Sequence, residues 1–284
     1  GCLPTSKEVM EQHSASDVQI YDLEFVQADD SATQDALVGI CKAAKVASLP
    51  EKTELNHKYL PPVDSQGVQG SCSAWATNYY MKSYMEAEEH DWDLSDGNKK
   101  HIFSPAFTYN QITHYEKNSD GTYNYNTGGT TIDENLDIII EQGACPFYNL
   151  SYNQYDGTTK PNDSQKDMAS NYKGVENPNT GNWHALHDVD SIKAYLAKGQ
   201  PVVVSMDTSN EYQSLSKKDP VLYKPTISED KWNELSESER DNYYCKTGSH
   251  ALCLVGYDEN YNHNGETVPV FKFVNSWGKW WGEN

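Results

Sequence analysis

The helical patterns of this 284-residue chain lie mainly in its first half and its strand patterns in its second half. A helix is predicted from Ser71, as N-cap, to about Glu89. Its predicted buried face holds Ala74, Trp75, Tyr79, Met81 and Met85. A second helix, DENLDIIIEQG over residues 133–143, should end at Gly143. This division is typical of an α+β fold.

The strand patterns follow a long polar connection. Residues 152–187 are rich in Asn, Asp, Gly, Thr and Pro, which predicts a surface segment or a lobe boundary. SIKAYLAKGQ then predicts a short helix that ends at Gly199. Three strands are expected in PVVVSM, ALCLVGYD and VPVFKFVNSW.

Residues 1–48 differ from the rest of the chain. DVQIYDLEFVQADD has a strand-like centre, and SATQDALVGICKAAKVAS predicts a short amphipathic helix. The following stretch carries Pro61 and Pro62, which resist helix formation, so we expect it to be extended. We therefore treat residues 1–48 as an N-terminal extension, either a pro-segment or a packed segment without a regulatory role.

Composition excludes several classes of function. The formal charge of −20 would repel nucleic acid and anionic membrane surfaces. The longest apolar runs are far shorter than the ~18 residues of a membrane span. The sequence also lacks the charged start and following apolar run that are typical of an export signal. Six cysteines are too few for a disulfide framework in a chain of this length, although Cys245 and Cys253 could pair or stay apart.

The stretch SQGVQGSCSAWA places Cys72 at the predicted start of a helix. A thiol attacks only as the thiolate, and its ordinary pKa of ~8.5 leaves little thiolate at neutral pH. The positive end of a helix and a neighbouring imidazolium both lower that pKa. Taken alone, however, a single cysteine is more often a small buried apolar residue than a nucleophile.

Two later residues could complete such a site. His250 begins the apolar strand in SHALCLVGYD, and Asn275 ends the strand in FKFVNSWG. A strand can direct an imidazole toward a cleft, and an Asn amide can orient the ring.

Together, LPEKTELNHKYLPPVDSQGVQGSCSAWA, SHALCLVGYD and FVNSWGKWWGEN resemble the papain-like cysteine peptidases, bacterial members in particular. The resemblance runs from about Leu49 to Asn284. It implies a two-lobe α+β fold, with a helical lobe at about 66–150, a β-rich, barrel-like antiparallel lobe at about 151–284, and the active site between them. The peptidase domain would then comprise residues 49–284.

The resemblance also implies the roles of particular residues. Cys72 would be the nucleophile, His250 the general acid and base, Asn275 its orienting partner and Gln66 the oxyanion-hole side chain. The residues expected on the substrate side are Gly128, Gly129, Ser205, Met206, Ser249 and Trp277, the last as an indole that covers the His–Asn pair. This chemistry requires no metal and no organic cofactor.

The chain departs from the family pattern at several positions. Gln69 stands where the best-known members have a disulfide-forming cysteine, Ser73 where a Trp usually follows the nucleophile, and Ser249 where Asn or Asp is common. Residues 207–248 also contain an apparent charged insertion, TISEDKWNELSESERDNYY, that could select substrates.

The favoured function is a cysteine endopeptidase or exopeptidase that acts on proteins or peptides outside the cytoplasm, as a secreted, periplasmic or cell-surface protein. Cys2 could carry a lipid at a processed N-terminus, and the alternative is an ordinary terminal thiol. Two other functions remain open: a binding or inhibitory protein that keeps the fold without turnover, and an enzyme that transfers the acyl group to an amine.

Overall fold

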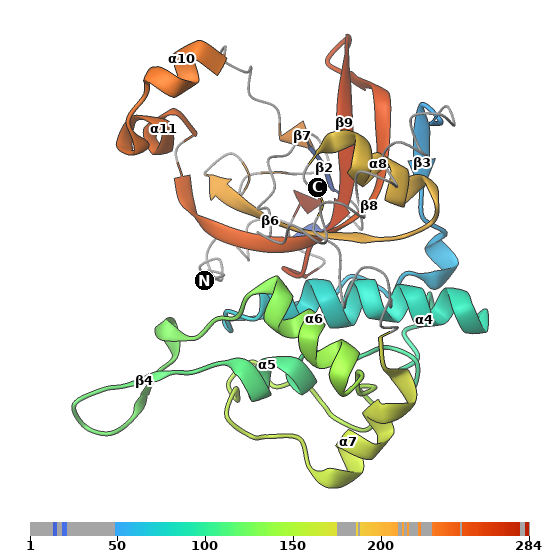
Figure 1. Ribbon diagram of the computed structural model, residues 1–284, viewed down its shortest axis with the longest axis vertical. Coiled ribbons are helices and arrows are strands. Elements are labelled where there is room, and N and C mark those ends of the chain that lie inside the picture. Colours follow the sequence, from blue (N-terminus) through green and yellow to red (C-terminus); the bar gives the residue numbers. More distant parts are fainter. Residues whose placement is uncertain are drawn as a thin grey trace.

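The computed structural model describes residues 49–174, 186, 188–209, 212, 215, 221–222, 229–244 and 246–278, with three short strand segments at 14–15, 19–21 and 282–283. Two kinds of structure are separated in space. Helices α4 (Ser83–His90), α5 (Ala106–Ile112), α6 (Ile132–Glu141) and α7 (Asp163–Ala169) lie on one side of the molecule, and the strands of the main sheet lie with α8 (Val189–Ala197) on the other (Figure 1). The predicted α+β class is confirmed.

One continuous helix runs through the centre of the fold. It comprises α3 (Cys72–Ala74), a π-helical stretch η2 (Trp75–Lys82) and α4 (Ser83–His90). Two side chains of the π-helical stretch donate hydrogen bonds to backbone carbonyls of the preceding turn. Thr77 Oγ1 donates to Ser73 O at 2.7 Å, and Asn78 Nδ2 donates to Ala74 O at 3.1 Å. Such π-helical insertions are frequent at functional sites.

Two details of this helix differ from the sequence prediction. Ser71 is the N-cap residue, but its hydroxyl makes no capping bond to the helix and pairs instead with the Tyr152 hydroxyl at 2.9 Å. Met85 is not buried, because Tyr84 and Ala87 occupy the inward face and Met85 points to a more exposed side. Gln200 Nε2 lies 3.2 Å from the Met85 sulfur.

Helices α5 and α6 pack beside this central helix. The structure has α5 at Ala106–Ile112, α6 at Ile132–Glu141 and short 3₁₀ turns η1 (His57–Tyr59), η3 (Tyr125–Thr127) and η4 (Ser170–Tyr172). Thr131 and Glu134 form a capping box at the start of α6. The predicted stop at Gly143 is confirmed: its φ is +97°, and a Cβ there would lie 1.8 Å from Ala169 O.

The predicted surface connection over residues 152–187 contains a helix that composition did not reveal, α7 (Asp163–Ala169). Asn162, a residue typical of loops, is the N-cap of α7 and forms a capping box with Gln165. Ala169 packs with Phe107 and Cys145, so the helical part extends beyond residue 150.

The main sheet has the order β3-β8-β9-β2-β7, with β6 also paired to β8. Its strands are β2 (Gln19–Tyr21), β3 (Lys52–Glu54), β6 (Val202–Ser209), β7 (Val221–Leu222), β8 (Lys246–His263) and β9 (Glu266–Val274). These confirm the three predicted strands, as well as the strand-like centre of the N-terminal extension. The helix expected over residues 31–48 lies outside the described residues.

Period-two alternation along β8 gives the sheet two buried faces. Leu252 and Leu254 pack in a cluster with α8 (Val189–Ala197), whereas Cys253 and Val255 pack in a cluster with the central helix. The insertion between β6 and β8 contains α10 (Glu229–Glu234) and α11 (Glu237–Tyr244). A separate pair joins β1 (Ser14–Ala15) to β10 (Gly282–Glu283).

Candidate active site

Cys72 is the first residue of the central helix and is fully buried. Its sulfur accepts a hydrogen bond from Ala251 N at 3.3 Å, which brings the helix start against β8. Cys72 is also disulfide-bonded. The other two described cysteines, Cys145 and Cys253, are free, so the second sulfur lies outside the described residues and Cys253 does not pair with Cys245.

His250 lies on β8 and is almost completely buried. Its Nε2–H donates to Asn275 Oδ1 at 2.6 Å, as required for an amide that orients the ring. Among the described residues Nδ1 has no hydrogen-bond partner. Burial lowers the pKa of His250 to about 4, although the bond to Asn275 acts in the opposite direction, so the imidazole is neutral at pH 7 in this state.

Asn275 is fixed from two sides at the end of β9. Its Oδ1 also accepts from Ser276 N at 2.8 Å, and its backbone carbonyl accepts from the Tyr80 hydroxyl at 2.7 Å. Tyr80 belongs to the central helix. The helix that begins at Cys72 therefore also helps to position Asn275.

Two aromatic rings cover the imidazole. The Trp277 ring lies 4.6 Å from His250, and the Tyr212 ring lies 6.1 Å from it. Tyr212 and Trp277 meet edge to face at 5.2 Å, and both are buried. Sequence reasoning did not find Tyr212, because an isolated tyrosine in the insertion carries no motif.

Gln66 lies on the loop before Cys72, with its side chain buried. Its Oε1 accepts from Ser276 Oγ at 2.7 Å, and its Nε2 donates to Gln69 O at 2.8 Å. Because an amide nitrogen carries two hydrogens, Nε2 can donate one further hydrogen bond. The Tyr152 hydroxyl donates to Gln66 O and pairs with Ser71 Oγ, so this tyrosine, which also lacks a motif, holds the loop against the helix start.

The expected substrate-side residues lie in two places. Ser73 Oγ donates to Thr130 O at 3.1 Å, so the segment that follows Gly128 and Gly129 lies beside the residue after Cys72. On β6, Ser205 is opposite Ala251 and half-buried. Met206 is opposite His250 and packs inside the cluster with α8.

Ser249 completes this set on β8. It is opposite Asp207 in the β6–β8 register and is half-buried. It precedes His250 directly, so its side chain lies on the opposite face of the strand from the imidazole.

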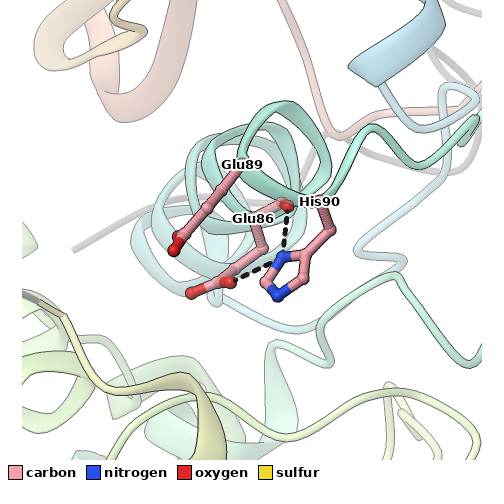
Figure 2. A group of neighbouring side chains, drawn as sticks. All are labelled: Glu86, Glu89 and His90. Atoms are coloured by element: carbon pink, nitrogen blue, oxygen red, sulfur yellow. Dashed lines mark hydrogen bonds and ion pairs between the residues drawn. The ribbon is translucent and has the colours of Figure 1, made fainter.

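One group of side chains in the described part of the chain has metal-ligand spacing: Glu86, Glu89 and His90 on α4 (Figure 2). The Glu86 carboxylate already accepts from Lys82 Nζ at 2.7 Å. The His90 ring nitrogen Nδ1 lies 2.9 Å from the Glu86 carbonyl oxygen and 3.4 Å from its carboxylate. Hydrogen bonds within the helix account for this group, so we assign no metal to it.

Comparison with solved structures identifies the class of fold. The chain is similar to xylellain, a cysteine protease from Xylella fastidiosa, with a TM-score of 0.55 and 21% identity over 95% of this chain and 85% of that one. It is also similar to digestive procathepsin L 3 of the Tenebrio molitor larval midgut, with a TM-score of 0.52 and 16% identity over 96% of this chain and 68% of that one. The fold is that of the papain-like cysteine peptidases.

Sequence comparison identifies the family. The profile of the Peptidase_C39 like family matches residues 104–283, a range that includes His250 and Asn275 but begins after Gln66 and Cys72. The chain is 24% identical over 251 residues to the uncharacterized peptidase C1-like protein L477 of Acanthamoeba polyphaga mimivirus, covering 87% of this chain and 67% of that one. The chain therefore belongs to the Peptidase_C39 like family, within the papain-like cysteine peptidases.

Each helix in the described part of the chain is too short or too polar to span a membrane.

Proposed function

We propose that this protein hydrolyses peptide bonds through a thioacyl-enzyme formed on Cys72. The thiolate attacks the peptide carbonyl carbon, His250 gives its proton to the leaving amine, and the carbon–nitrogen bond breaks. Water then loses a proton to His250 and attacks the thioester carbonyl, which releases the carboxylic acid and restores the thiolate. The Gln66 amide and the Cys72 backbone N–H would stabilise the oxyanion.

One observation carries this proposal: the buried His250 ring is held by Asn275 through Nε2, while Nδ1 has no partner among the described residues. A buried ring nitrogen without a hydrogen-bond partner lowers the stability of the fold, and a catalytic role is one reason for a protein to keep such a group. The backbone N–H of Ala251, the residue after His250, donates to the Cys72 sulfur, so Cys72 lies against the part of β8 that carries His250. In the reduced protein, Nδ1 would be the atom that exchanges a proton with the thiol.

Membership of a cysteine peptidase family makes peptides the expected substrates. We propose that the Gly128–Gly129 backbone and the half-buried Ser205 and Ser249 contact the peptide. Met206 would support the site from beneath, because its side chain lies in the cluster that also contains Trp277.

The experiment is labelling of the reduced protein with an epoxysuccinyl peptide, followed by mass spectrometry of the adduct. We expect the adduct on Cys72 and its loss in His250→Ala. Cys145 is the internal control, because burial raises its pKa to about 12 and it should stay unlabelled. A fold-only binding protein would leave Cys72 unlabelled after reduction, and an acyl-transferring enzyme would be labelled but would join the acyl group to an added amine.

The oxyanion role of Gln66 has its own test. Removing one oxyanion donor typically lowers turnover by about 10²–10³-fold. We expect Gln66→Ala to lower the acylation rate by this factor, measured by single-turnover cleavage of a fluorogenic peptide. An unchanged acylation rate would remove Gln66 from the mechanism.

A further inference from the structure

Polar residues in the helical part of the molecule form a closed hydrogen-bond network. They lie on the central helix, on α5, on α6 and directly after Gly129, and they are Ser73, Thr77, Asn78, Thr108, Thr130 and Asn135. All except the half-buried Thr130 are at most 4% exposed. We call these residues the polar network.

The path from the central helix to α6 passes through α5. Asn78 Nδ2 donates to Thr108 Oγ1 at 2.7 Å, and the Thr108 hydroxyl donates to Asn135 Oδ1 at 2.6 Å. A hydroxyl can accept one hydrogen bond while it donates another, so Thr108 joins the two amides. Removing this hydroxyl would take a partner from both amides in a buried place, where the loss is larger than at the surface.

The path then continues from α6 to the segment that follows the two glycines. Asn135 Nδ2 donates one hydrogen to Thr130 Oγ1 at 2.8 Å and the other to a backbone carbonyl of the same segment at 2.7 Å. The carbonyl of Thr130 accepts from Ser73 Oγ at 3.1 Å. Thr130 follows Gly129 and Ser73 follows Cys72, so the network ends beside the glycine pair and beside the nucleophile.

The π-helical stretch of the central helix closes the network. Thr77 Oγ1 donates to Ser73 O at 2.7 Å, and Asn78 Nδ2 lies 3.3 Å from Thr77 Oγ1. Successive side chains of an α-helix do not face each other, yet Thr77 and Asn78 both belong to this network. The start of the central helix is therefore tied through buried side chains to α5 and α6.

We propose that Thr108 and Asn135 are positioning residues that hold the Gly128–Gly129 backbone in place relative to Cys72. This inference rests on the proposed function, in which that backbone binds the peptide. Both residues act through Thr130, and neither touches the peptide. A closed network of buried groups suits this role, because any shift of the glycine segment breaks a hydrogen bond that water cannot replace.

A network that only stabilised the packing of the helices would behave differently. Breaking it would lower the free energy of unfolding and leave the affinity of the folded protein for peptides unchanged. Stability and peptide binding are therefore measured on the same variants.

The first test uses Thr108→Val, which keeps the shape of the side chain and removes the hydroxyl, in reduced protein with a fluorogenic peptide. We expect kcat/KM to fall about tenfold, mainly through KM, because the glycine backbone moves while Cys72 and His250 stay in place. Alkylation of Cys72 by iodoacetamide should keep its rate and its pH profile, because this small reagent does not use the glycine backbone. An unchanged KM would overturn the inference.

Two further variants separate the hydroxyl from a general effect on folding. Thr108→Ser keeps the hydroxyl and should restore the wild-type KM. If it keeps the raised KM of Thr108→Val, the hydroxyl is not responsible and the inference is wrong. Tyr257→Phe is the matched control, because it removes another buried hydroxyl, which donates to Pro50 O at 2.6 Å, and it should leave KM unchanged.

Ser73→Ala cuts the network at its other end and remains informative if Thr108→Val fails to fold. It removes the bond to Thr130 O directly and should raise KM by a similar factor. The double variant Ser73→Ala with Thr108→Val should have a KM no higher than either single variant, because both changes act on one segment. Increases in KM that multiply in the double variant would show that the two residues act separately and would contradict the inference.

Binding of fluorescein-labelled casein peptides to unreactive Cys72→Ala protein, measured by anisotropy, distinguishes this inference from the proposed function. Weaker binding after Thr108→Val is added supports the polar network, even if the wild-type protein cleaves nothing. Cleavage by the wild-type protein, together with equal peptide binding with and without Thr108→Val, rejects the role of the network and retains the peptidase. Absence of both cleavage and binding would overturn both proposals.

Discussion

At the scale of single residues, the disulfide at Cys72 and the unpartnered Nδ1 of His250 have a common explanation. A sulfur that is bonded to another sulfur cannot give the ring a proton or receive one from it. The structure thus represents an oxidised state in which the imidazole is buried and neutral. Reduction would place a thiolate near the ring, and a nearby negative charge raises a histidine pKa.

We therefore expect labelling of Cys72 to depend on reduction. A dithiol reductant gives two electrons and two protons to the disulfide and is itself oxidised to a disulfide, which frees both protein thiols. Before this step an epoxysuccinyl peptide should give no adduct on Cys72, and after it the adduct should form. Equal labelling of Cys72 in protein kept under oxidising and reducing conditions would contradict this prediction.

His250 should also make the oxidised protein less stable in mild acid. Its folded pKa of about 4 lies below the ordinary value of 6.5, so the unfolded chain binds the proton more readily. The neutral His250 ring contributes up to about 3 kcal/mol to the free energy of unfolding. This contribution is fully present above pH 6.5 and is lost as the pH falls toward 4 and below. Urea unfolding of the wild-type protein and His250→Gln at pH 4–7 measures this difference. Parallel pH profiles would show that His250 titrates normally.

At the scale of elements, the central helix carries a buried ion pair. Lys82 Nζ and Glu86 Oε1 lie 2.7 Å apart, with side chains 6% and 8% exposed. Removing one member of a buried pair leaves an uncompensated charge and typically costs 3–5 kcal/mol. We expect Glu86→Ala to lower the free energy of unfolding by about this amount in urea titration.

Two comparison variants make the prediction about this ion pair specific. Lys58 and Asp91 form an exposed pair at 2.7 Å, and Lys58→Ala should lower the free energy of unfolding far less than Glu86→Ala does, because solvent screens an exposed pair. Replacing both Lys82 and Glu86 by Met and Leu should restore most of the lost stability, because no charge is then buried. If Glu86→Ala lowers the free energy of unfolding no more than Lys58→Ala does, the Lys82–Glu86 pair does not act as a buried ion pair.

The same elements show what could be predicted from the sequence. The central helix, the stop at Gly143 and the three strands follow from local periodicity and glycine, which act within a few residues. Met85 and α7 were missed because tertiary packing decides which side of a helix is buried, and because Asn162 serves loops and helix caps equally. Tyr152 and Tyr212 act only through contacts with residues distant in sequence, and no local pattern reveals such contacts.

At the scale of the whole molecule, the helical part and the sheet share a core. Trp75, Tyr79 and Tyr80 of the central helix belong to one buried cluster with Cys253 and Val255 of β8. The strand that carries His250 therefore has one face against the helix that carries Cys72. Because neither side of this cluster can stay buried without the other, we expect the two parts to unfold together.

Hydrogen exchange of the native protein tests this coupling. Val255→Ala removes buried methyl groups from the shared cluster and should cost about 2 kcal/mol. It should raise the exchange rates of the slowest amides by the same factor in β8 and in α6, whose Ile139 is buried among the helices. Val268→Ala is the matched control, because Val268 packs in a small cluster with Val270 and Tyr261 away from the central helix, and it should affect only the β8–β9 hairpin. If Val255→Ala accelerates exchange in β8 while α6 keeps its wild-type rates, the two parts unfold independently, and Cys72 and His250 are held together only by the contacts at the site itself.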